Sequence, residues 1–152
     1  MKARLAIAIL IASPAFGVAS AADQLLDKLV LDGSKQLLVN SPLQPALDAD
    51  PGLAARLKKY TPRERCEALE RGYLASWEVR ESKLYLTRVE VDACNKPRSV
   101  PLSLLFPGQS SPVEAGWFTG ELRIQKRYPI LYVKGGAVTG KLNLEREKNK
   151  SK

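Results

Sequence analysis

Cysteine is the first residue type to consider as a nucleophile or a metal ligand in this 152-residue chain. The two cysteines are Cys66 and Cys94, and the chain contains no histidine. A nucleophilic cysteine needs a neighbouring base, usually histidine, and a zinc site needs more than two thiols. We therefore expect no catalytic cysteine and no metal site. Two interpretations of the pair remain, a disulfide or two free thiols.

Carboxylates are the other side chains that could carry acid–base chemistry. Glu78, Glu90 and Glu121 fall on neighbouring predicted strands, and two carboxylates about 5–10 Å apart form the arrangement used by glycosidases. Each of them alternates with arginine or lysine, as on an ordinary solvated sheet face, so cross-strand Glu–Arg pairing is the expected use. A carboxylate-based hydrolase is the remote alternative. Without histidine, a phosphate loop or a metal cluster, we expect neither a cofactor nor enzymatic activity.

The first 21 residues predict export. Lys2 and Arg4 form a short basic region, residues 5–12 form an unbroken apolar run, and residues 19–21 (ASA) are typical of a cleavage site before Ala22. This order is that of a cleavable secretory signal peptide. The apolar run is far shorter than the roughly 20 residues of a membrane-spanning helix. We expect a periplasmic or extracellular protein without a transmembrane anchor.

The charge balance restricts the class of partner. The formal net charge is +8, and two of the basic residues lie in the predicted signal peptide. Residues 145–152 (EREKNKSK) lack apolar side chains, so we expect a disordered charged tail. The remaining excess fits attraction to an anionic envelope surface, and no basic stripe with interleaved aromatic residues indicates specific nucleic-acid binding. We expect an unknown protein or an envelope component as partner, and the oligomeric state stays open.

Asp32-Gly33 between two apolar runs is the first structural signal after the signal peptide. Asp-Gly in this position favours a β-hairpin, here with strands over 27–31 and 36–40. The rival interpretation is a short helix over residues 23–31, where the leucines also fit helical spacing. Three prolines then predict an irregular segment over 41–52.

A pair of short helices is predicted next. Asp50 is a favourable N-cap, followed by proline, for a helix over 51–60. Thr61 is followed by proline and, two residues later, by a glutamate that completes a capping box, which predicts a helix over 62–71 ending at Gly72. The basic side chains of this pair could form an anion-binding face, but a solvated face paired with glutamates is the expected use. They are Arg56, Lys58, Lys59, Arg63 and Arg65.

The clearest strand pair surrounds the turn at Glu81-Ser82. Residues 73–80 and 84–91 alternate with period two. A tight turn here brings Cys66 and Cys94 together at the open end of the hairpin, and export favours oxidation, so we predict a disulfide between them. Further strands are predicted over 100–106, 115–124, 128–133 and 137–144, the last two joined by Gly135-Gly136.

Short connections between about seven strands predict a mainly β fold. We expect an antiparallel meander, closed into a small barrel or left as a curled sheet, with the short helical pair after the first hairpin. The chain then consists of a signal peptide (1–21), a single β-rich domain (22–144) and a charged tail (145–152).

Two blocks of the chain resemble a group of small uncharacterised bacterial proteins. The first block is residues 71–78 (RGYLASWE) with 83–86 (KLYL), and the second is 105–107 (LFP) with 115–124 (AGWFTGELRI). The resemblance spans most of residues 27–144 and implies a shared β-rich fold. It implies no established activity and no catalytic residues.

Trp117 is the leading candidate for contact with a partner. Its side chain points to the face opposite the apolar residues of the predicted strand 115–124, so we expect it to be exposed or to lie in an interface. The alternative is a sheet covered on both faces, with the helical pair packed over this tryptophan. The accompanying partner-binding candidates on the same strand face are Thr119, Glu121 and Arg123.

Tyr73, Trp77 and Tyr85 form the second candidate set. Core packing is the expected role of the first two, while an open barrel interior would let all three line a ligand cavity. The sequence therefore favours a secreted or periplasmic, non-enzymatic binding or accessory domain. A small-molecule carrier, only loosely similar to lipocalins, is the alternative.

Overall fold

The protein is described by a computed structural model over residues 23–64, 66–125 and 130–142. The predicted signal peptide and charged tail lie outside these described residues. The strands are β1 (Asp27–Leu31), β2 (Ser34–Leu38), β3 (Tyr73–Arg80), β4 (Lys83–Val91), β5 (Arg98–Val100), β6 (Val113–Glu114), β7 (Gly120–Arg123), β8 (Ile130–Lys134) and β9 (Ala137–Leu142). The helices are α1 (Gln44–Ala49), α2 (Pro51–Lys58), the 3-10 turn η1 (Glu67–Leu69) and α3 (Leu102–Leu105).

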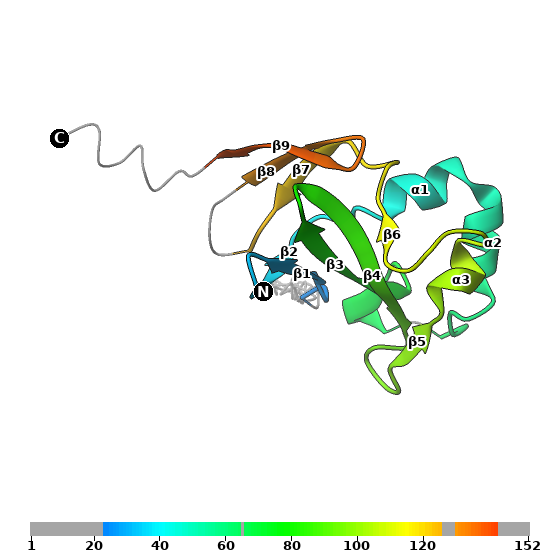
Figure 1. The fold of residues 1–152 in the computed structure, drawn as a ribbon. Coiled ribbons are helices and arrows are strands. Elements are labelled where there is room, and N and C mark those ends of the chain that lie inside the picture. Colours follow the sequence, from blue (N-terminus) through cyan, green and yellow to red (C-terminus); the bar gives the residue numbers. More distant parts are fainter. Residues whose placement is uncertain (1–22, 65, 126–129, 143–152) are drawn as a thin grey trace, which may run out of the picture.

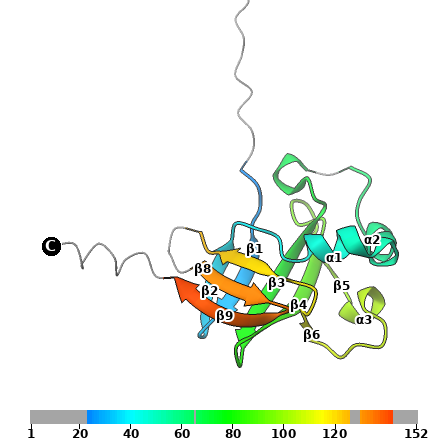
Figure 2. The same cartoon turned by 90° about the horizontal axis from the view of Figure 1, so that it is seen from above.

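The strands form one curled sheet that nearly closes into a barrel, which confirms the predicted mainly β fold. The strand order is β2-β1-β3-β4-β9-β8-β7, with β5 and β6 paired to β4. In Figures 1 and 2, α1, α2 and α3 gather at one end of the sheet, away from β7, β8 and β9.

The two ends of this sheet meet. Leu38 at the end of β2 forms an antiparallel bridge with Ile124, just after β7. The Val39 amide donates to the Arg123 carbonyl at 2.8 Å. The Asn40 side chain continues this contact, because its Nδ2 donates to the Glu121 carbonyl at 2.7 Å and its Oδ1 accepts from the Arg123 amide at 3.0 Å. One asparagine side chain thus pairs with β7 as a further strand residue would.

One pairing departs from an antiparallel meander. β1 lies parallel to β3, with Lys28 opposite Ser76 and Leu29 opposite Trp77. Parallel neighbours need a long crossover connection. The segment that carries α1, α2 and η1 supplies it, and β1 becomes an interior strand between β2 and β3.

Three two-residue turns occur where the sequence predicts them. Asp32-Gly33, Glu81-Ser82 and Gly135-Gly136 all have positive φ at both positions, between 50° and 81°. That conformation matches the twist of antiparallel strands. The hairpin interpretation of residues 27–40 is therefore confirmed over the helical one, with β2 beginning at Ser34.

The helical segment agrees with prediction in α2 and differs around it. Asp50 caps α2, and its Oδ1 accepts from the amides of Gly52 at 2.8 Å and Leu53 at 3.1 Å. The segment predicted to be irregular contains α1, whose first turn tolerates Pro45 because that position needs no amide hydrogen.

The predicted helix over 62–71 is wrong, because among the described residues of this range only η1 is helical. The Thr61 hydroxyl donates to the Leu57 carbonyl at 3.2 Å, so it closes the end of α2 instead of capping a new helix. Cys66 has extended backbone and is bonded to Cys94 across a Cα–Cα distance of 6.5 Å, which confirms the predicted disulfide. Gly72, with φ of 81°, ends the turn.

Two predicted strands are shorter than expected. Residues 100–106 divide into β5, which ends at Val100, and the one-turn helix α3. The strand predicted over 115–124 is reduced to β7, because the Phe118 amide donates to the Ala115 carbonyl at 2.9 Å in a turn that precedes it. Period-two alternation therefore does not apply to residues 115–119.

The inside of the curled sheet is filled with side chains. Those with at most 1% exposure include Leu29, Trp77, Leu84, Leu86 and Leu122. Leucines of α2 and α3 belong to the same hydrophobic cluster, so the helices close one end of this core. Buried side chains of this kind typically pack at the density of an organic crystal.

Candidate functional site

Tyr73 and Trp77, candidates for lining a ligand cavity, are core residues whose polar atoms are already paired. Each is 1% exposed. The indole Nε1 of Trp77 donates to Asp27 Oδ2 at 3.0 Å, and the Tyr73 hydroxyl donates to Gln44 Oε1 at 3.2 Å. Burial, with the negative charge of Asp27 adding to it, raises the pKa of the Tyr73 hydroxyl, so that group remains a donor.

Asp27 is the centre of a polar network that the sequence analysis did not identify. It has no exposed surface, and its Oδ1 accepts from an Arg71 guanidinium nitrogen at 2.5 Å and from the Ala75 amide at 3.0 Å. Burial raises the pKa of the Asp27 carboxyl, and the Arg71 charge opposes that rise. The signal in the sequence was an aspartate at an inward position of β1, two residues before Leu29. This network joins β1 to β3, and its central carboxylate is inaccessible to solvent.

Tyr85 lies on the other face of the sheet. The pairing of β3 with β4 shifts between Ser76 and Trp77, so Trp77 lies opposite Leu86 and Tyr85 lies opposite Glu78. A bulge of this kind reverses which side chains face inward. Tyr73, Trp77 and Tyr85 are therefore not brought together around one cavity.

Trp117 is half-buried, so the predicted exposure of its side chain is wrong. Its ring stacks on Phe106 with centroids 5.3 Å apart and an interplanar angle of 6°. Its Nε1 donates to the Pro42 carbonyl at 3.0 Å. The physical reason is the turn before β7, which removes the strand phase on which the prediction depended. It contacts the segments just before α1 and just after α3. This arrangement is similar to the alternative in which helices cover this tryptophan.

The other partner-binding candidates lie along β7 and the turn before it. Thr119 is exposed, and its hydroxyl accepts from the Gly135 amide at 2.9 Å. Glu121 and Arg123 are brought together, with Arg123 Nε 3.1 Å from Glu121 Oε2. The first contact stabilises the turn between β8 and β9, and the second lies on the surface of β7.

The three glutamates considered for acid–base chemistry are all ion-paired. Glu78 contacts Arg80 at 2.7 Å, and Glu121 contacts Arg123 as described above. Glu90 contacts both Lys28 and Arg88 at 3.5 Å. The expected pairing with basic residues occurs, although the arginine partners lie two residues away on the same strand.

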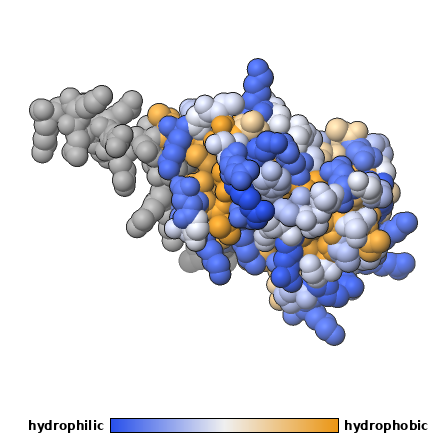
Figure 3. All heavy atoms as spheres, viewed as in Figure 1, coloured by the Kyte–Doolittle hydropathy of each residue, from blue (hydrophilic) through white to orange (hydrophobic). Residues whose placement is uncertain are grey.

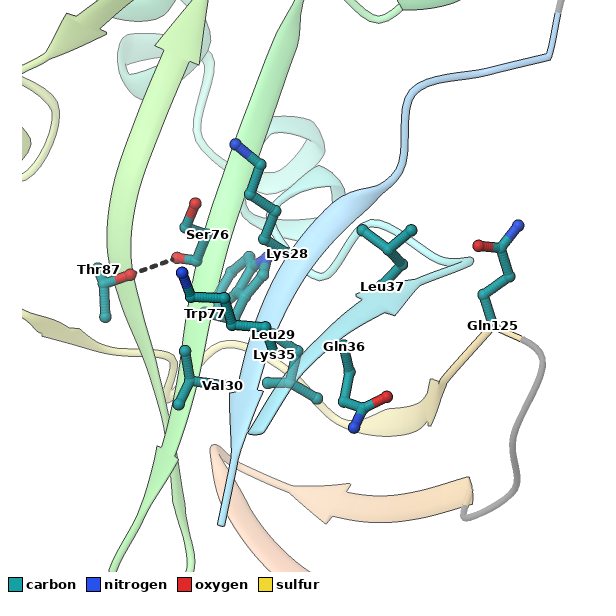
Figure 4. A pocket seen from close by; sticks show the side chains of 10 residues that line it. All are labelled: Lys28, Leu29, Val30, Lys35, Gln36, Leu37, Ser76, Trp77, Thr87 and Gln125. Atoms are coloured by element: carbon teal, nitrogen blue, oxygen red, sulfur yellow. Dashed lines mark hydrogen bonds between the residues drawn. The ribbon is translucent and has the colours of Figure 1, made fainter. Parts of the chain in front are cut away.

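A hollow on the outside of the barrel is the best candidate site in the described part of the chain. It has a volume of about 680 Å³ and lies over the outer face of β1, β2 and β3. Figure 4 shows the ends of Lys28 and Lys35 on its β3 side, near Ser76 and Thr87, and Leu37 on the opposite side toward Gln125. The residues that line it include Lys28, Val30, Lys35, Leu37, Ser76 and Thr87, together with the buried Leu29 and Trp77.

A second hollow of about 500 Å³ continues the first and shares Lys28, Leu37 and Gln125 with it. It adds the apolar side chains of Leu26, Val39 and Leu74. We call the two together the outer-face groove.

The outer-face groove exposes apolar surface. Leu37 is 42% exposed and Val39 is 54% exposed, and they are two of the four exposed large hydrophobic side chains among the described residues. On the face of the molecule in Figure 3, hydrophobic side chains reach the surface between hydrophilic ones. The sequence signal was the uninterrupted apolar character of residues 29–31 and 37–39, which places apolar side chains on both faces of the first hairpin.

The described residues contain no helix both long and apolar enough to cross a bilayer. Within the same residues, no three His, Cys, Asp or Glu side chains are grouped where they could hold a metal ion. No family model, no curated protein and no solved structure matches this chain. The geometry of the outer-face groove is therefore the basis of the functional argument.

Proposed function

We propose that this protein is an exported, non-enzymatic binding domain that holds its partner in the outer-face groove. The observation that carries this proposal is the exposed apolar surface of Leu37 and Val39 beside Lys28 and Lys35. Exposed apolar surface next to charged side chains is typical of interaction sites.

The packing of the interior supports a site on the outside. The side chains that would line a carrier's cavity are in the core, where Trp77 and Tyr73 are each 1% exposed. A carrier of the lipocalin kind needs open volume within the barrel. The ion pairs of Glu78, Glu90 and Glu121 likewise supply an ordinary structural use for the carboxylates that a hydrolase would require.

The disulfide supports the exported location. Cys66 and Cys94 are oxidised in the structure, and such bonds persist in the periplasm and outside the cell. The residues of the predicted signal peptide agree with that location. A partner in the envelope or beyond it is therefore the relevant class.

Site-specific photo-crosslinking in the cell of origin tests this proposal. A photoreactive residue at position 37 should form a discrete adduct, because this side chain reaches into the outer-face groove. The matched control is position 139, an exposed residue of β9. Circular dichroism should show the same fold for both variants. No adduct at position 37, or the same adducts at both positions, contradicts the proposal.

A further inference from the structure

The strand register arranges the outer-face groove into a charged side and an apolar side. In the pairing of β1 with β2, Lys28 lies opposite Leu37 and Val30 lies opposite Lys35. Lys28 is also opposite Ser76 of β3. Residues that face one another across a ladder share a face of the sheet, so both ammonium groups border the same floor.

The apolar side lies beyond Leu37. Val39 and Leu26 follow in the second hollow, and Leu74 of β3 lines it as well. Asp23 lies in this second hollow, whereas no aspartate or glutamate is among the described residues that line the first. The acidic residue and the two lysines are therefore in different parts of the outer-face groove.

The lysines retain charge for a ligand. Lys35 is exposed and has no ion pair with any described residue. Lys28 contacts Glu90 at 3.5 Å, but Glu90 also contacts Arg88 at the same distance, and the Lys28 side chain is 56% exposed. The Glu90 side chain is 13% exposed, and a pair of this length whose lysine is largely exposed contributes little. An incoming anion would therefore meet two available ammonium groups.

The size of the first hollow fits one small molecule. Its volume of about 680 Å³ falls within the range of about 300–1,000 Å³ that is common for small-molecule sites. A purely polar ligand would leave Leu37 and Val39 in water. A neutral apolar ligand would remove water from the lysines without a compensating partner.

We infer that the outer-face groove binds a single anionic amphiphile. Its acidic head group lies between Lys28 and Lys35, and its alkyl chain covers Leu37 and continues toward Val39 and Leu74. This inference rests on the proposed function, because it names the chemical class of the partner. The head group forms charge-assisted hydrogen bonds with the ammonium groups, while the chain removes apolar surface from water.

Titration of the purified mature protein with dodecyl phosphate, below its micelle concentration, tests the inference. We expect saturable binding by calorimetry, with amide NMR shifts concentrated in β1 and β2. Dodecyl maltoside, which has the same chain and a neutral head, should bind about tenfold more weakly, and inorganic phosphate should not bind measurably.

Two variants separate the parts of the outer-face groove. Lys35→Glu should weaken dodecyl phosphate by about tenfold or more and leave dodecyl maltoside unchanged, because it reverses one charge. Leu37→Asp should weaken both amphiphiles. Lys141→Glu, on the exposed surface of β9, is the matched charge control and should change neither affinity.

Several outcomes overturn the inference. Equal affinities for dodecyl phosphate and dodecyl maltoside would show that the lysines do not bind the acidic head group. Binding to phosphatidylglycerol vesicles without binding to monomeric dodecyl phosphate would assign the face to a bilayer surface instead. A protein adduct at position 37 with no amphiphile binding would overturn this inference and leave the proposed function standing. The absence of both an adduct and amphiphile binding would overturn the inference and the proposed function together.

Discussion

Trp77 and Asp27 are joined at the centre of the protein by a 3.0 Å hydrogen bond from the indole Nε1 to Oδ2. The two residues are 50 positions apart in the chain, and Asp27 has no exposed surface. The bond lies where β1 runs parallel to β3. One buried carboxylate therefore holds the first strand against the central hairpin.

Replacement of this carboxylate should destabilise the fold strongly. Asp27→Asn keeps the size of the side chain, but its amide nitrogen cannot accept a hydrogen bond, so buried donors on one side of the group lose their acceptor. Because Arg71 is itself partly exposed, we expect a loss of about 2–4 kcal/mol in the free energy of unfolding. Urea unfolding measures it. Asp32→Asn, in an exposed turn that favours asparagine, is the control, and equal stability of both variants would contradict the prediction.

The stability contributed by Asp27 should depend on pH. Burial raises the pKa of its carboxyl above the usual 3.8, so the folded protein binds this proton more readily than the unfolded chain. The stability contributed by the Asp27 carboxyl is fully present below the pKa of this group in the unfolded chain. It is lost as the pH rises through the pKa of the group in the folded protein. The destabilisation caused by Asp27→Asn should therefore be larger near pH 3 than near pH 7. A larger effect near pH 7 would mean that the Arg71 charge outweighs burial.

Removal of the disulfide should also destabilise the protein. Cys66 and Cys94 are 28 residues apart, and closing such a loop contributes roughly 3–4 kcal/mol in the chain-entropy treatment. The double serine variant should lose about that much in denaturant unfolding. The intact mass of protein purified from the periplasm should correspond to residues 22–152 less two hydrogen atoms. Two thiols that react with an alkylating agent before reduction would contradict the bond.

Trp117 should contribute to stability through packing. Trp117→Ala removes the stack on Phe106 and the donor to the Pro42 carbonyl, so we expect a loss of about 2–3 kcal/mol. Trp117→Phe keeps a ring and should lose about 1 kcal/mol. Tyr132→Ala, at an exposed position of β8, is the control for loss of an aromatic ring. Wild-type thermal stability in Trp117→Ala would contradict this role.

The Asn40 side chain should stabilise the contact between the end of β2 and β7. Asn40→Ala removes both side-chain hydrogen bonds to β7 and should destabilise by about 1–2 kcal/mol. Hydrogen exchange is the sharper measurement, because the Arg123 amide loses its acceptor and should exchange faster. Asn40→Asp retains that acceptor and should protect the Arg123 amide better than alanine does. Asn95→Ala, whose partner is the local Asp92, should leave this amide unchanged.

Several predictions based on local residues agree with the structure. Asp32-Gly33 and Glu81-Ser82 make two-residue turns because their backbone conformation depends on the turn residues themselves. Asp50 caps α2 for the same reason. The Cys66–Cys94 bond follows from one tight hairpin between them. Each of these features involves groups close in the chain or joined by a single turn.

Two other local patterns had a different outcome, and one site depended on contacts between distant segments. Thr61 has the sequence of a helix cap, yet its hydroxyl binds the Leu57 carbonyl in α2, and the following residues lead into the disulfide. Trp117 was expected on an exposed strand face, but a turn at Ala115–Phe118 directs it onto Phe106. The outer-face groove was missed because it depends on which strands lie beside β1.

The sequence by itself determined the β-rich character, the positions of the turns, the disulfide and the expectation of export. Hydrophobic period and turn chemistry specify such features through neighbouring residues. Only the tertiary structure decided that β1 lies parallel to β3, that Asp27 is buried beneath Trp77, and that β2 meets β7. These depend on free energy shared among segments far apart in the chain, which no local pattern records.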